Sequence, residues 1–233
     1  LMWPDAMYVK PLFTNESICP LPTFEAPMDH DHTQHILHNE DFRDMAIERF
    51  AGGLRIDTTI DDEATDEDFA KFKIFHDYLR TSFPLVHETA EVNLINNWSL
   101  VFEFPGSDPS LKPVLLMAHQ DTVPFGDLST WELDPLSGHI DYEEGKVYGR
   151  GSNDVKNLLM GLLGAMEELL IQKDGHLNLK RGVILAFGHD EEISGNFGAY
   201  HIGQYILNKY GPKSIDHIIC LLYTSDAADD SLR

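Results

Sequence analysis

Apolar residues recur at helical spacing in the first half of the chain. One such pattern predicts a helix from Asn39 to Phe50, with Gly52-Gly53 as its stop signal. A second helix follows the acidic run from Asp61 to Asp68, and we expect Pro84 to end it. Its apolar face is formed by Phe69, Phe72, Phe75, His76 and Leu79. A stripe of this kind is typical of a helix that packs on a hydrophobic core.

Strand patterns dominate the following part of the chain. Residues 86–94 and 99–104 predict a hairpin that turns at Asn96-Asn97. Three continuous apolar runs then predict buried strands, at residues 114–118, 183–187 and 215–222. Helical stripes separate these runs, one beginning at Asp154 and one covering residues 196–210. The β-α-β-α-β alternation predicts an α/β fold with a mainly parallel sheet flanked by helices.

Three segments have less regular patterns. Residues 1–38 are rich in proline, histidine and aspartate, and we expect them to form an extended arm. Residues 125–147 look irregular. Gly161 and Gly164 lie inside a predicted helix, where glycine costs stability, so we interpret them as allowing a close approach to the sheet.

Polar residues follow the apolar runs at three points. His119 and Asp121 come after the run PVLLM, Asp154 lies in the stretch G-R-G-S-N-D, and Glu191 and Glu192 follow GVILAF. Strand ends are rigid and their loops converge, so side chains far apart in sequence can meet there. Imidazole and carboxylate ligands arranged in this way suit a metal site. Taken alone, His119 with Asp121 fits a polar pair at a strand end equally well, and Asp154 fits a helix N-cap.

The spacing of these residues assigns different roles to neighbours. His119 and Asp121 are two positions apart, so on an extended strand they point to the same side. Asp121 therefore suits the orientation of His119 through the second ring nitrogen better than it suits direct metal binding. Glu191 and Glu192 are adjacent and face opposite ways, so one can bind metal while the other moves a proton. A buried glutamate pair without a cation would be costly, which favours the metal hypothesis.

Composition excludes some classes of partner. Asp+Glu 39 against Lys+Arg 17 gives a net charge of -22, which would repel nucleic acids and anionic membranes. Two cysteines, Cys19 and Cys220, are too few for a disulfide framework and match no zinc-finger spacing. No run of residues approaches the length of a membrane span.

Two further features are candidate modification or metal sites. Asn15-Glu16-Ser17 and Asn97-Trp98-Ser99 are acceptor triplets for glycosylation in a secretory-route protein, although chance also produces such triplets. Histidines cluster near the N-terminus, at His30, His32, His35 and His38. Flexible histidines bind metal weakly when nothing orients them, so we regard this cluster as the lesser candidate.

Three ordered motifs identify a family resemblance. H-x-D-T-V-P at His119, then G-R-G-S-x-D-x-K-N through Asp154, then F-G-H-D-E-E-x-S-G through Glu192 resemble the zinc metallopeptidase family of aminoacylase, acetylornithine deacetylase and carboxypeptidase S. The sequence flanking D-E-E is most similar to the carboxypeptidase S branch. The resemblance covers about residues 39–219, which we expect to be the N-terminal part of a catalytic domain.

The resemblance implies roles for the site residues. His119 would bind one zinc ion, Asp154 would bridge two, and Glu192 would bind the other. Asp121 would orient His119, and Glu191 would act as the general base. It also implies a cis peptide bond after Asp154, a homodimer formed through a lid domain, and a location in the vacuole lumen or the secretory pathway.

The chain departs from the family pattern at Cys220. Relatives have an aspartate there that completes the first zinc site, and a final histidine and the lid domain lie further on. We therefore interpret residues 220–233 as a tail foreign to the family and not native, with a genuine alternative terminus as the competing explanation, and we expect the dizinc domain to be partial. With Asp154 and one further ligand for each zinc, this chain alone should bind metal weakly and lack useful activity. A thiolate from Cys220 in place of the aspartate is the less favoured alternative.

Three functions remain open at this point. The first is a zinc-dependent hydrolase that releases the C-terminal amino acid from short or N-blocked peptides. The second is an N-acyl-amino-acid hydrolase with the same chemistry. The third is a truncated, non-catalytic isoform that binds or regulates, which would have to fold with an open sheet edge.

Overall fold

A five-stranded sheet forms the centre of the molecule, whose computed structural model describes residues 35–220. The strand order is β1-β2-β6-β3-β7. The strands are β1 (Glu91–Ile95), β2 (Ser99–Phe104), β3 (Val114–His119), β6 (Val183–Gly188) and β7 (Ile218–Cys220). β6, β3 and β7 run parallel, while the β1–β2 hairpin adds two antiparallel pairings at one side. The predicted α/β fold and the predicted hairpin turn are confirmed, with Asn96 and Asn97 both at positive φ.

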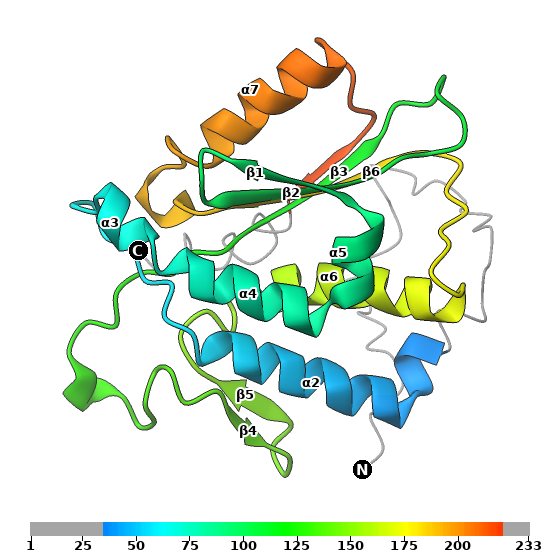
Figure 1. The fold of residues 1–233 in the computed structure, drawn as a ribbon. Coiled ribbons are helices and arrows are strands. Elements are labelled where there is room, and N and C mark those ends of the chain that lie inside the picture. The colour runs from blue at the N-terminus through cyan, green and yellow to red at the C-terminus, as the bar shows by residue number, and fades with distance from the viewer. Residues whose placement is uncertain (1–34, 221–233) are drawn as a thin grey trace, which may run out of the picture.

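Helices cover both faces of this sheet (Figure 1). One face carries α7 (Ala199–Tyr210), and the other carries α4 (Phe72–Ser82), α5 (Pro84–Thr89) and α6 (Lys156–Gln172). α2 (Glu40–Leu54) lies outside α6, and the short α3 (Asp66–Phe69) precedes α4. The larger core joins the sheet to α4, α5 and α6, and includes Phe75, Phe102, Leu163 and Phe187, all 0% exposed. A smaller core lies under α7.

The edge strand β7 differs from the strands inside the sheet. Neighbouring residues of a strand face opposite sides, yet Ile218 and Ile219 are 62% and 45% exposed. Both faces of β7 are therefore open. By contrast, β6 has hydrogen-bonded neighbours on both edges, β2 on one and β3 on the other.

One predicted helix boundary is wrong and another is confirmed. Gly52-Gly53 does not stop α2, which continues to Leu54. A Cβ atom at Gly52 would lie 2.1 Å from the hydroxyl oxygen of Tyr78, so this glycine lets α4 pack closely on α2. The helix through Phe72 ends at Ser82, just before Pro84 as predicted, and Pro84 itself begins α5, where its missing N–H needs no partner. The strand expected from residue 86 consequently begins later, at Glu91.

The less regular segments also differ from expectation. Residues 139–148 contain a small two-stranded sheet, β4 (His139–Asp141) and β5 (Lys146–Tyr148), which the polar sequence concealed. Gly161 and Gly164 do not approach the sheet: a Cβ at Gly161 would meet no heavy atom within 4 Å, and one at Gly164 would only touch Phe83. Residues 1–34 of the expected arm lie outside the described residues, and residues 35–38 are helical.

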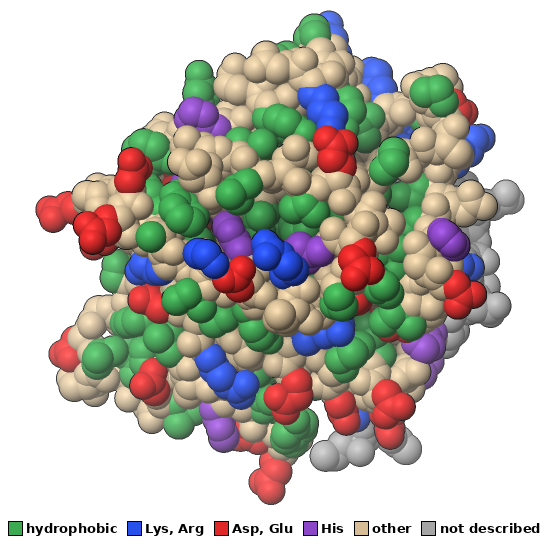
Figure 2. Space-filling model, in the orientation of Figure 1, with side chains coloured by type: hydrophobic (Ala, Val, Ile, Leu, Met, Phe, Trp, Pro, Cys, Tyr) green, Lys and Arg blue, Asp and Glu red, His purple; other side chains and the backbone are tan. Residues whose placement is uncertain are grey.

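The surface carries many acidic side chains (Figure 2), as the net charge of the sequence indicates. Figure 2 shows acidic side chains spread over one face of the molecule, with Lys and Arg scattered among them. Within residues 35–220, every helix is too short or too polar to cross a membrane.

Candidate metal centre

His119 is the last residue of β3 and lies at the end of the sheet where the parallel strands finish. Its side chain is 2% exposed. Its Nδ1 atom lies 2.9 Å from the backbone oxygen of Asp121 and 3.3 Å from the Oδ1 atom of the same residue. Asp121 thus touches Nδ1 and leaves Nε2 directed at the opposite side, which is the arrangement that the two-residue spacing predicts.

The Nε2 atom of His119 faces two carboxylates. Asp154 Oδ1 lies 2.9 Å away and Glu191 Oε2 lies 3.6 Å away. Asp154 comes from the loop before α6, and the peptide bond that follows it is cis, as the family resemblance implies. Its side chain is 48% exposed, so it lines an accessible surface rather than the core.

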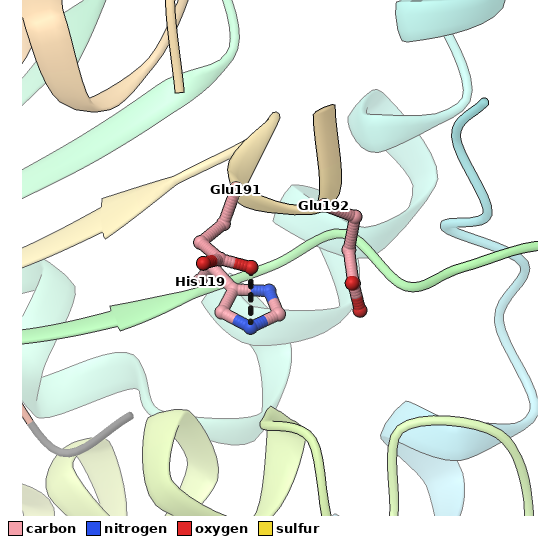
Figure 3. A group of neighbouring side chains, drawn as sticks. All are labelled: His119, Glu191 and Glu192. Carbon is pink, nitrogen blue, oxygen red and sulfur yellow. Dashed lines mark ion pairs between the residues drawn. The ribbon is translucent and has the colours of Figure 1, made fainter. Parts of the chain in front are cut away.

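Glu191 and Glu192 lie on a single turn after β6, the 3-10 segment η2 (Glu191–Ile193). Figure 3 shows both carboxylates extending from this turn, with Glu191 over the ring of His119. The backbone N–H of Glu192 donates to Asp121 Oδ2 at 2.9 Å. Asp121 therefore connects the histidine at the end of β3 with the turn that carries both glutamates.

Burial and neighbouring charges shift the pKa values of two of these groups. Burial by itself lowers the pKa of His119, but the carboxylates of Asp121 and Asp154 and the charge of Glu191 raise it to about 11. Burial raises the pKa of Glu192 to about 7, with the charges of Asp154 and Asp121 adding to the effect and His119 opposing it. Negative charge is concentrated here, and a cation or a proton must balance it.

The donor set fits a divalent metal ion. His119, Glu191 and Glu192 each offer one ligand atom, and these atoms lie within 4.8 Å of one another. An imidazole nitrogen with carboxylate oxygens is a combination that zinc commonly binds. We call His119, Glu191 and Glu192 the 4.8 Å group. Asp154 is not a member of this group, but its Oδ1 atom lies 2.9 Å from His119 Nε2. All five residues singled out in the sequence thus meet, and the division of roles among them stays a prediction.

Lys156 is a residue near the site to which the sequence assigned no role. It is 1% exposed, and its Nζ atom donates to the backbone oxygens of Gly53 at 3.1 Å and Ile56 at 2.8 Å. Gly53 belongs to the last turn of α2, and Ile56 lies two residues beyond its end. Burial lowers the pKa of Lys156 to about 7, although the charges of Asp57 and Asp121 act against this. Its position in the motif D-x-K-N was the available signal.

The other candidate sites lie apart from this centre. His30, His32 and Asn15 are outside the described residues, and His35 contacts Glu168 at 2.6 Å instead of forming a metal group. Asn97 is exposed in the hairpin turn, while Ser99 of the same triplet is 0% exposed. Cys220 pairs with Met117 in the sheet and is not part of the 4.8 Å group. The interpretation of residues 221–233 falls outside the described residues.

Comparison with known proteins gives consistent matches. Residues 115–228 match Peptidase family M20/M25/M40. Carboxypeptidase S of Saccharomyces cerevisiae is 42% identical over 212 residues, which is 88% of this chain and 35% of that protein. N-fatty-acyl-amino acid synthase/hydrolase PM20D1 of Bos taurus is 43% identical over 134 residues, covering 57% of this chain and 25% of that protein.

A solved structure supports the fold. The dipeptidase Dug1p from Saccharomyces cerevisiae superposes with a TM-score of 0.62 at 17% identity, over 83% of this chain and 41% of that one. At this identity the match concerns the fold alone. The chain spans about a third of the length of the carboxypeptidase S sequence that it matches.

Proposed function

Because the chain belongs to peptidase family M20/M25/M40, we propose that it supplies the metal-binding strand ends of a zinc-dependent hydrolase. Its substrates are short or N-blocked peptides, from which the C-terminal amino acid is released. The observation that carries the proposal is the meeting of His119, Glu191 and Glu192 within 4.8 Å, beside Asp154. The similarity to carboxypeptidase S supports the choice of reaction.

Three residues would hold the metal ions, namely His119, Asp154 and Glu192. When bound, two zinc ions would acidify a water molecule and polarise the carbonyl of the scissile amide. Asp121 would orient His119 for metal binding. Asp121 contacts Nδ1, so the Nε2 atom of His119 would offer its lone pair to the metal once Nε2 has lost its proton.

Glu191 would carry the proton during the reaction. Its side chain is 39% exposed, so it can reach a water molecule and a substrate, unlike the buried Asp121. The carboxylate would take a proton from the attacking water and return it to the leaving amine. Glu192 differs because its backbone is fixed to Asp121, which suits a residue that must hold an ion in place.

N-acyl-amino-acid hydrolysis is the second candidate. The 43% identity to the N-fatty-acyl-amino acid synthase/hydrolase PM20D1 favours it. The metal-binding residues and the proton carrier would be the same in both reactions, because each cleaves an amide next to an amino acid carboxylate. The two reactions differ in the acyl group of the substrate, which is a peptide in the first and a non-peptide acyl chain in the second.

The location and assembly follow from the carboxypeptidase S resemblance. We place the protein in the vacuole lumen or the secretory pathway, as a homodimer formed through a lid domain. Asn97 is exposed on the hairpin turn and would carry a glycan there. Loss of a mass shift after Asn97→Gln, in protein isolated from its own cells, would support this location.

Substrate comparison tests the proposed reaction. The protein, expressed from its complete reading frame and loaded with zinc, is given an N-blocked dipeptide, the C-terminal amide of that dipeptide and an N-fatty-acyl amino acid. We expect release of the C-terminal amino acid from the first and little reaction with the amide. Preference for the third would favour the second candidate, and no hydrolysis of any would contradict both.

Matched variants separate the roles of the two glutamates. Glu191→Gln should abolish turnover while zinc binding persists, and Glu192→Gln should weaken zinc binding itself. Glu63→Gln, at an exposed loop position, is the control and should change neither. Equal zinc affinity in all three would contradict the assignment of Glu192 as a ligand.

A further inference from the structure

Asp190 immediately precedes the two glutamates and is completely buried. Its carboxylate is bound by backbone N–H groups at the beginning of α7. Oδ2 accepts from Phe197 at 2.5 Å, and Oδ1 accepts from Gly198 at 2.7 Å. Each oxygen thus has its own donor, so the carboxylate joins the end of β6 to the start of a helix on the other side of the turn.

Backbone hydrogen bonds within the turn also end at Asp190. The backbone oxygen of Asp190 accepts from Gly195 at 2.8 Å and from Ile193 at 3.3 Å. Gly198 is needed for the approach, because a Cβ atom there would lie 2.4 Å from Asp190 Oδ1 and 2.9 Å from the backbone nitrogen of His189. Residues 190–198 therefore form a closed loop tied at Asp190 by both its side chain and its backbone.

We infer that Asp190 is a positioning residue that fixes the carboxylates of Glu191 and Glu192 relative to His119. The turn is held from two sides: Asp190 ties it to α7, and Asp121 Oδ2 binds the N–H of Glu192 from the β3 side. Neither tie depends on a metal ion, so the geometry exists before binding. The inference rests on the proposed function, because Asp190 affects metal binding only if Glu191 and Glu192 belong to the metal site.

A purely structural role for Asp190 is the competing explanation, and the chain offers a matched control. Glu167 on α6 is also buried, at 2% exposed, and its carboxylate accepts the N–H groups of Leu85 at 3.2 Å and Val86 at 2.8 Å at the start of α5. Both carboxylates therefore satisfy two backbone donors at a helix start. The hydrogen bonds of Glu167 are to α5 and not to the turn that carries the two glutamates.

The experiment compares Asp190→Asn and Glu167→Gln in the complete protein. In each variant an amide NH₂ would face a backbone N–H, so both should lower the melting temperature. We expect Asp190→Asn alone to weaken zinc binding, by about 10- to 100-fold in a chelator competition titration. In metal-free protein it should also speed amide hydrogen exchange at Glu192 and Ile193, which Glu167→Gln should leave unchanged.

Gly198→Ala provides a second variant if Asp190→Asn does not fold, because it keeps the carboxylate but displaces it. Equal zinc affinity and equal exchange at Glu192 in the Asp190 and Glu167 variants would overturn the inference. Should the unmodified protein bind no zinc, the proposed function fails, while the exchange of metal-free protein still decides whether Asp190 holds the turn.

Discussion

His119 Nε2 and Asp154 Oδ1 lie 2.9 Å apart, although the residues are separated by 35 positions in the chain. The bond connects the end of β3 with the loop that leads into α6. The raised pKa of His119 favours a proton on Nε2, between these two atoms, in the metal-free protein. A bound metal ion would replace this proton, so metal binding should release protons to the solvent.

Removal of the Asp121 charge should weaken the metal site without removing a ligand. Asp121 is 0% exposed and contacts both His119 and the N–H of Glu192. We expect Asp121→Asn to lower zinc affinity by about 10- to 100-fold, the usual effect of a residue that orients a ligand. Competition with a chromophoric chelator measures this. Asp108→Asn, at an exposed turn, should bind zinc like the unmodified protein.

The raised pKa of Glu192 predicts a pH-dependent stability difference. In the folded, metal-free protein its pKa is about 7, against an ordinary value of 4.5, so the folded state keeps a proton that the unfolded chain loses. Its contribution therefore becomes unfavourable as pH rises from about 4.5 to about 7. We expect Glu192→Gln to gain stability relative to the unmodified protein across this window.

Urea denaturation of both proteins at each pH gives the difference in the free energy of unfolding. Titrating groups without a charge interaction with Glu192 are common to both proteins and cancel, whereas His119, Asp154, Asp121 and Glu191 interact with it and contribute to the measured difference. A difference that stays constant between pH 4.5 and pH 7 would show that Glu192 titrates at its ordinary pKa.

Lys156 should stabilise the end of α2. Lys156→Met removes the Nζ donor from the backbone oxygen of Ile56 and from that of Gly53, which keeps the N–H of Ile56 at 3.4 Å, and leaving a buried acceptor unsatisfied costs roughly 1–3 kcal/mol. We expect a lower free energy of unfolding by about that amount. Lys73→Met removes an exposed lysine paired with Asp77 and should cost no more than about 0.5 kcal/mol. Similar values for both variants would indicate that burial of the Lys156 ammonium cancels its hydrogen bonds.

Two glycines inside helices should respond in opposite directions to alanine. Gly52→Ala places a methyl group 2.1 Å from the Tyr78 hydroxyl, and overpacking of this kind costs about 1–3 kcal/mol. Gly161→Ala meets no atom within 4 Å and should stabilise α6 by about 0.5–1 kcal/mol, because alanine loses less backbone entropy than glycine. Denaturation midpoints measure both, and destabilisation by Gly161→Ala would contradict the open space beside it.

The convergence of the site could be predicted because it depends on strand order and little else. His119 and Glu191 each follow a buried apolar run, and the ends of parallel strands meet at one edge of a sheet. The prediction that Asp121 turns toward His119 needed only the two-residue period of a strand.

The errors concern residues whose role depends on distant neighbours. The sequence predicts a stop signal at Gly52, but the role of this glycine is set by Tyr78 on another helix. The aliphatic part of Lys156 is buried between elements that no local pattern connects, so its bonds to α2 had no sequence signal beyond the motif. Pro84 marks the end of α4 as predicted, but it also begins α5, where a strand was expected from residue 86, because proline can both end and begin helices.

The position of β6 between β2 and β3 has a consequence for the order of events during unfolding. Its backbone amides are hydrogen-bonded within the interior of the sheet, so they exchange with solvent only when the whole domain opens. The turn bearing Glu191 and Glu192 begins where this strand ends. The two carboxylates are thus attached to the central strand of the sheet, and loss of the metal centre on heating should coincide with global melting rather than precede it.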